Sequence, residues 1–72
     1  MNRAEHWGKK IIEADSSRDY KLVKSILDEA QKETKSIETT GDGVHLWLFS
    51  DGSVLRTTPE QNGEIGRVQW TK

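Results

Sequence analysis

The chain has 72 residues, a net charge of −1 at pH 7 and no cysteine. This length suits one small domain, residues 1–72, with a core near the lower size limit for independent folding. The lack of cysteine excludes disulfides and thiolate metal sites, and the balanced charge argues against a protein that binds nucleic acid through surplus Lys and Arg.

The chain shows no sign of membrane insertion or export. No segment approaches the run of about 20 apolar residues that a membrane span needs. Residues 1–6 lack the apolar region of a secretory signal. Three tryptophans, one tyrosine and one phenylalanine are too many aromatic side chains for a disordered chain of this size. We therefore expect a folded, cytoplasmic protein with no membrane partner.

A first helix is predicted between Asn2 and the polar run at residues 15–17. Asn2 is a favourable N-cap residue, and Glu5 three positions later completes a variant of the capping box. Gly8 lies inside the helix and costs about 1 kcal/mol relative to alanine, so the helix depends on packing, with Trp7 as its anchor. Apolar residues recur at steps of three and four, the spacing of one helix face: Ala4, Trp7, Ile11 and Ala14.

A second helix is predicted from Ser17 to about Lys35, with Asp19 in the first turn, where the helix dipole favours an acidic side chain. Residues 36–42 then form a polar connection. The outer arc of the helix is charged, which is typical of a solvated surface. The inner arc is apolar and contains Tyr20, Val23, Ile26, Leu27 and Ala30.

Three antiparallel strands are predicted between residues 44 and 70. The dipeptides Asp51-Gly52 and Asn62-Gly63 favour two-residue hairpin turns. On this count Leu48 faces Leu55 in the first hairpin, and Leu55 faces Trp70 in the second. A three-residue loop with a glycine bulge at Gly52 is the alternative, and it shifts the first pairing by one residue. Pro59 is expected at the end of the middle strand, because it cannot donate to the ladder.

In the two-residue register one face of the sheet is aliphatic and the other mixes aromatic, aliphatic and basic side chains. Because an aliphatic sheet face must be covered, we expect the second helix to pack on it. The predicted fold class is α+β: two N-terminal helices followed by a three-stranded antiparallel meander. The first helix could lie beside the second, cover the opposite face or mediate a dimer. The aliphatic face contains Val44, Leu46, Leu48, Leu55, Thr57, Val68 and Trp70, and the opposite face contains His45, Trp47, Phe49, Val54, Arg56, Thr58, Ile65, Arg67 and Gln69.

No residue pattern predicts an enzyme, a metal site or a cofactor. His6 and His45 are the only histidines and do not form a metal-binding motif. The run Gly41-Asp42-Gly43 precedes a strand instead of opening a helix, so it does not match a dinucleotide-binding loop. Glu60 and Glu64 come close across the second hairpin, but both are expected to be solvated. We expect a non-enzymatic protein.

The predicted binding residues are Trp47, Phe49, Arg56, Arg67 and His45, neighbours on the mixed face. Aromatic and guanidinium groups are typical of protein interfaces, and they also stack bases of single-stranded RNA or DNA. The alternative is structural: a Trp47–Arg56 cation–π pair, or a face covered by the first helix. The balanced charge favours a protein partner over nucleic acid. The expected function is that of a small regulatory binding module, with a second copy of the chain as another candidate partner.

Overall fold

The structure is a computed structural model that describes residues 1–58, 60–61 and 64–71, with residues 60–61 and 64–65 described by their backbone only. Two helices precede an antiparallel sheet with the strand order β1-β2-β3-β6, and β4 pairs with β5 as a separate short ladder. The α+β class is confirmed, with four strands in the main sheet instead of three. The elements are α1 (Arg3–Ser16), α2 (Tyr20–Gln31), β1 (Thr34–Thr39), β2 (His45–Phe49), β3 (Val54–Thr57), β4 (Glu60–Gln61), β5 (Glu64–Ile65) and β6 (Val68–Trp70).

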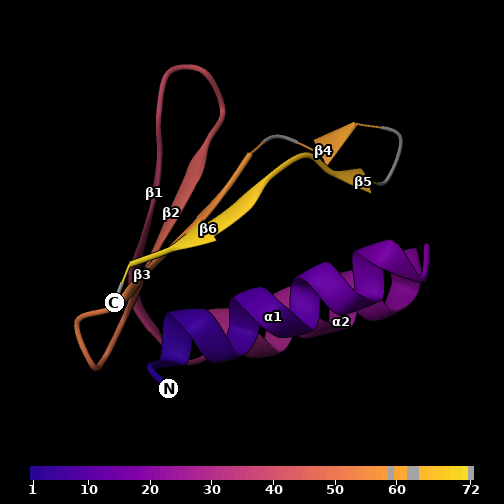
Figure 1. The fold of residues 1–72 in the computed structure, drawn as a ribbon. Coiled ribbons are helices and arrows are strands. Elements are labelled where there is room, and N and C mark those ends of the chain that lie inside the picture. The colour runs from indigo at the N-terminus through magenta and orange to yellow at the C-terminus, as the bar shows by residue number, and fades with distance from the viewer. Residues whose placement is uncertain (59, 62–63, 72) are drawn as a thin grey trace.

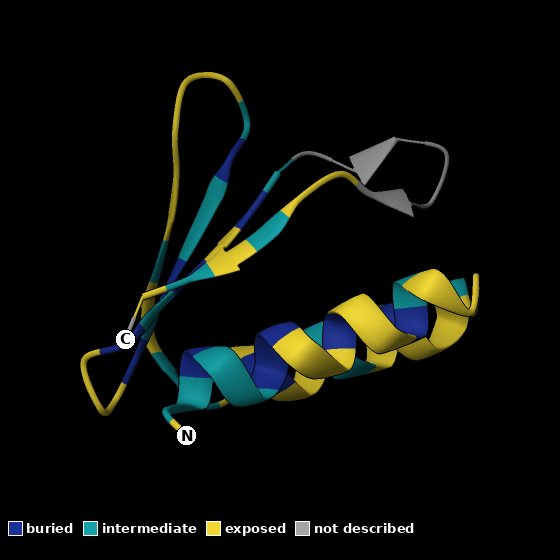
Figure 2. Ribbon diagram, viewed as in Figure 1, coloured by how far each residue is buried: buried dark blue, intermediate teal, exposed yellow. Residues whose placement is uncertain are grey.

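Helix α1 begins as its sequence predicts. The Asn2 side chain accepts a hydrogen bond of 2.8 Å from the backbone N–H of Glu5, so Asn2 is the N-cap. The predicted apolar stripe is buried along its full length, and buried and exposed segments alternate along the α1 ribbon in Figure 2. Trp7 is 8% exposed, which agrees with its predicted role as an anchor.

Helix α2 begins later and ends earlier than predicted. Its N-cap is Asp19, whose carboxylate accepts from the N–H of Leu22 at 3.1 Å, whereas Ser17 is the C-cap of α1. At the other end, the Thr34 hydroxyl donates to the carbonyl of Gln31 at 2.7 Å, which satisfies a helix-terminal carbonyl as the chain turns. The predicted connection at residues 36–42 therefore includes most of strand β1.

The register between β2 and β3 differs by one residue from the two-residue turn. Trp47 faces Leu55, Leu48 faces Val54, and the N–H of Phe49 donates to the Ser53 carbonyl at 2.9 Å. The loop therefore has three residues, 50–52, and its last residue, Gly52, has a φ of +87°. The glycine-bulge alternative is confirmed, because only glycine adopts this conformation at little cost.

The register between β3 and β6 agrees with the prediction. Leu55 faces Trp70, Arg56 faces Gln69 and Thr57 faces Val68. The expected turn at Asn62-Gly63 and the expected place of Pro59 lie outside the described residues. Because only the first hairpin is shifted, the predicted sorting of side chains onto the two faces is wrong: β2 has turned over relative to β3.

Both helices lie side by side on one face of the sheet, as Figure 1 shows. Helix α1 packs on β2, β3 and β6, and α2 packs on β1. The first helix therefore takes the first of its three expected positions, beside the second. The core between helices and sheet consists of Ala4, Trp7, Ile11, Ala14, Val23, Ala30, Trp47, Phe49 and Leu55.

The N-terminus of α1 is attached to the loop between β2 and β3. Asp51 Oδ2 accepts from the N–H of Arg3 at 2.8 Å, and Ser53 Oγ accepts from the N–H of Ala4 at 3.0 Å. The Arg3 guanidinium also forms two hydrogen bonds, of 2.7 and 2.8 Å, with the Glu33 carboxylate just before β1. The bonds to Asp51 and Ser53 satisfy first-turn N–H groups of α1, and the Asp51 carboxylate places an anion at the positive end of the helix dipole.

Gly8 permits the close approach of α1 to β6. A Cβ atom on Gly8 would lie 2.4 Å from Cε3 and 2.8 Å from Cζ3 of Trp70, and 3.2 Å from Cδ1 of Leu55. The residue that weakens the isolated helix is therefore the one that lets the folded helix reach the sheet.

We predict that Gly8→Ala destabilises the protein. Helix propensity alone would add about 1 kcal/mol, but overpacking against Trp70 costs about 1–3 kcal/mol. Chemical denaturation should show a net loss of about 1 kcal/mol. The control is Gly41→Ala, where the new Cβ would meet nothing within 4 Å. A gain in stability for Gly8→Ala would contradict the packing described here.

We also predict that Asp51 makes stability depend on acid pH. The hydrogen bond from the Ser53 hydroxyl and the N–H of Arg3 lower the pKa of Asp51 from 3.8 to about 2. The contribution of this carboxylate is therefore complete above about pH 4 and is lost as the pH falls through about 2. Asp51→Asn should lower the melting temperature at neutral pH, and the difference from wild type should shrink between pH 4 and 2. The control Asp28→Asn, on the exposed side of α2, should show no such pattern.

Candidate binding surface

The sheet has a second face, on the side away from both helices. The strand pairings align its side chains in two rows: Glu38, Leu46, Arg56 and Gln69 in one, and Ser36, Leu48 and Val54 in the other. These positions alternate with the buried ones, as the period of a strand requires. We call these seven residues the open face: Ser36, Glu38, Leu46, Leu48, Val54, Arg56 and Gln69.

The centre of the open face is aliphatic and slightly hollowed. Leu46, Leu48 and Val54 are each partly exposed, whereas Leu55, next to Val54 in the chain, is completely buried. A shallow groove of about 140 Å³ runs between these three side chains and the two open-face residues of β1. The hydrophobic strip is thus accessible to another molecule from the solvent side.

Polar groups surround the strip. Glu38 and Arg56 flank Leu46 on opposite sides, and Arg56 Nη1 donates to Gln69 Oε1 at 3.1 Å. Neither Glu38 nor Arg56 belongs to the ion pairs formed between described residues. Both charges are exposed and available to an approaching surface.

The predicted binding residues do not share one face. Trp47 is 8% exposed and Phe49 is completely buried, both under the helices. The indole N–H of Trp47 donates to Thr57 Oγ1 at 3.1 Å inside the core. Arg56 lies on the opposite face. The prediction of one aromatic and basic face is wrong because it used the two-residue turn, which places Trp47 opposite Arg56 instead of Leu55.

His45 and Arg67 lie at the end of the sheet that is far from the β2–β3 loop. His45 shares the side of Trp47, makes a 2.9 Å hydrogen bond between Nδ1 and Thr39 Oγ1, and meets the Trp47 ring edge-on. Arg67 is exposed, and its backbone pairs with Thr58 one position beyond the β3–β6 ladder. Leu46 and Leu48 were missed as surface residues because the two-residue turn placed them on the aliphatic face, whereas Val54 was expected on the face of Arg56 and lies there.

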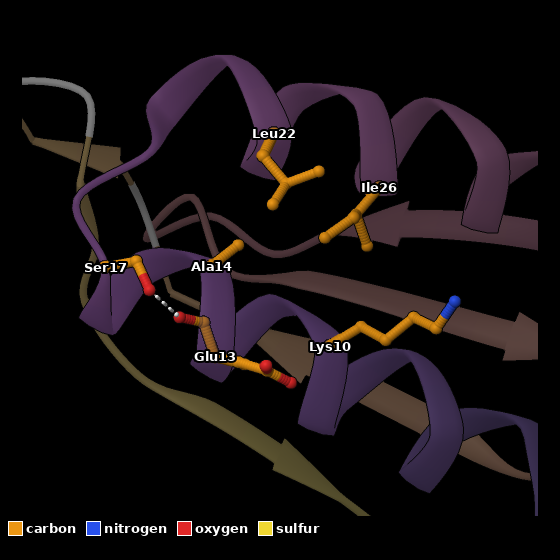
Figure 3. A pocket seen from close by; sticks show the side chains of 6 residues that line it. All are labelled: Lys10, Glu13, Ala14, Ser17, Leu22 and Ile26. Carbon is orange, nitrogen blue, oxygen red and sulfur yellow. Dashed lines mark hydrogen bonds between the residues drawn. The ribbon is translucent and has the colours of Figure 1, made fainter.

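A second hollow lies between the two helices. Figure 3 shows Ala14 of α1 directed toward Leu22 and Ile26 of α2, with Lys10 and Glu13 along the rim. Its volume is about 280 Å³, just below the usual range for small-molecule pockets. Ser17 Oγ donates to the Glu13 carbonyl at 3.1 Å, so this hydroxyl is used to end the helix. The hollow does not present converging polar groups of the kind that orient a ligand.

The titratable groups near the N-terminus of α1 serve structure. Burial, followed by the nearby charges of Arg3 and Lys10, lowers the pKa of His6. Hydrogen bonds from Arg3 lower the pKa of Glu33. Among the described residues, no three His, Asp or Glu side chains are arranged to hold a metal ion. In the same part of the chain, neither helix has the length and apolar character needed to cross a bilayer.

Comparison with known proteins gives no functional assignment. No protein-family model, curated protein or solved structure matches the chain. The function must therefore be inferred from the surface itself.

We predict that a charge at Leu55 and a charge at Leu48, on opposite faces of adjacent strands, lower the stability of the protein by very different amounts. Leu55→Asp buries an uncompensated carboxylate and should cost about 4 kcal/mol or more, enough to unfold a domain of this size. Leu48→Asp places the charge on the open face and should cost only about 1 kcal/mol. Urea denaturation followed by circular dichroism separates the two results. Equal loss of structure would mean that Leu48 is also core.

Proposed function

We propose that the protein is a small, non-enzymatic regulatory module that binds another protein through its open face. The observation that carries this proposal is the aliphatic strip of Leu46, Leu48 and Val54, which is partly exposed at the centre of a sheet face that neither helix covers. Contiguous apolar surface of this kind is characteristic of interaction sites, because its exposure to water is unfavourable.

The arrangement around the strip supports the same function. Protein interfaces combine an apolar centre, depleted of charge, with a polar rim that stays in contact with water. Here Glu38 and Arg56 lie on the two sides of Leu46, and Ser36 lies beside Leu48. Arginine is enriched among residues that dominate binding energy. A cytoplasmic location is compatible with the absence of cysteine.

Nucleic-acid binding receives less support. Base stacking needs exposed aromatic rings, and the described open-face residues include no aromatic side chain. Arg56 and Arg67 are two cations in a chain with a net charge of −1. A protein partner fits the aliphatic strip better than a phosphate backbone does.

We predict that a photo-crosslinking amino acid at Leu48 captures a protein in cells that make the chain at its natural level. The matched control carries the same crosslinker at Leu22, which is 46% exposed on α2. Gel mobility and mass spectrometry should find a protein adduct from position 48 and little or none from position 22.

Three outcomes would contradict the proposal. They are adducts only from position 22, adducts to nucleic acid from position 48, or no adduct from position 48 in a protein that remains folded. Folding of both labelled proteins is checked by thermal unfolding.

A further inference from the structure

The row of residues through Leu46 carries opposite charges on its two flanks. Glu38 on β1 and Arg56 on β3 both face Leu46 of β2, one from each side. Strands are spaced by about 4.8 Å, so the two charged residues start about 10 Å apart with β2 midway between them. The open face therefore carries a negative charge on the β1 side of β2 and a positive charge on the β3 side.

This pattern is complementary to itself. Consider two sheets stacked face to face with a twofold axis that runs along β2, between them. The axis brings β1 of each copy opposite β3 of the other, and so sets Glu38 of each copy against Arg56 of the other. Leu46 and Leu48 each meet the same residue of the second copy. This twofold rotation thus packs the leucines of the two copies against each other and pairs Glu38 with Arg56 at two places.

We propose that the open face binds a second copy of this chain, in a symmetric dimer with two Glu38–Arg56 contacts. This inference rests on the proposed function and names the partner. Because the interface is isologous, the Glu38–Arg56 contact occurs twice in one dimer, so a substitution at either residue changes both contacts.

The size of the face sets the strength of this dimer. Four strands of about five residues span roughly 19 by 17 Å. That area is well below the roughly 800 Å² that each partner buries in a standard stable interface. The dimer is therefore weak and forms as the protein concentration rises. A different protein could compete for the same strip.

Sedimentation velocity from micromolar to millimolar protein tests the proposal. Wild type should convert from the 8.2 kDa monomer to a dimer. Glu38→Arg and Arg56→Glu should each weaken dimerisation by about tenfold, since each variant brings like charges together at two symmetric contacts. Matched charge reversals on the outer side of α2, Asp28→Arg and Lys24→Glu, should leave the dimer unchanged.

The most discriminating experiment is an equal mixture of Glu38→Arg and Arg56→Glu chains. In a mixed dimer both contacts again join opposite charges, so the mixture should dimerise about as tightly as wild type, roughly tenfold more tightly than either variant alone. The double variant E38R/R56E should also regain wild-type dimerisation. Thermal unfolding checks each fold, and Glu38→Gln with Arg56→Gln provides a milder second series.

The results separate this proposal from the proposed function. A wild type that stays monomeric at every concentration overturns the dimer, as does a mixture that stays monomeric. If Leu48 nevertheless crosslinks to a different protein, the proposed function stands without the dimer. If the wild type is monomeric and Leu48 gives no adduct, both are rejected.

Discussion

The carboxylate of Asp51 joins the first helix to the first hairpin, and the arrangement of the sheet depends on this junction. One oxygen accepts from the N–H of Arg3 at the start of α1, and the other accepts from the N–H of Ser53 across the loop. The Ser53 hydroxyl in turn accepts from Ala4. The loop that caps the helix is therefore the loop that sets the register of β2 against β3. In the register that goes with this loop, Trp47 and Phe49 lie on the side of β2 that faces the helices.

That choice has a direct consequence for the surface. With the three-residue loop, Trp47 and Phe49 complete the core, where the Trp47 indole N–H finds Thr57 as its acceptor. The leucines of β2 are left on the face away from both helices, where they are partly exposed. Burying two large aromatic side chains removes more apolar area from water than burying two leucines would, so this arrangement favours the fold. Its cost is an aliphatic strip that stays partly exposed to water.

Sequence patterns predict most of the fold but not the residues of the open face. The Asn2 cap, the apolar stripe of α1 and the β3–β6 register follow from local rules, because each depends on residues close together in the chain. The loop at Asp51-Gly52 satisfies the rules for both two and three residues, and the contact with Arg3 that distinguishes them is distant in sequence. Strand β1 was missed because it is an edge strand with a single large apolar residue, Ile37, and its pairing with β2 determines its conformation.

The most direct test of this account is a nuclear Overhauser spectrum of the β2–β3 hairpin in solution. In the register described here, Leu46 faces Arg56 and Leu48 faces Val54 at positions that do not exchange hydrogen bonds, where the α-protons of the two strands come closest. Cross-peaks between the α-protons of Leu46 and Arg56, and of Leu48 and Val54, are expected. Cross-peaks from Trp47 to Arg56 and from Phe49 to Val54 would instead indicate the two-residue turn. They would return the aromatic rings to the open face and contradict the account.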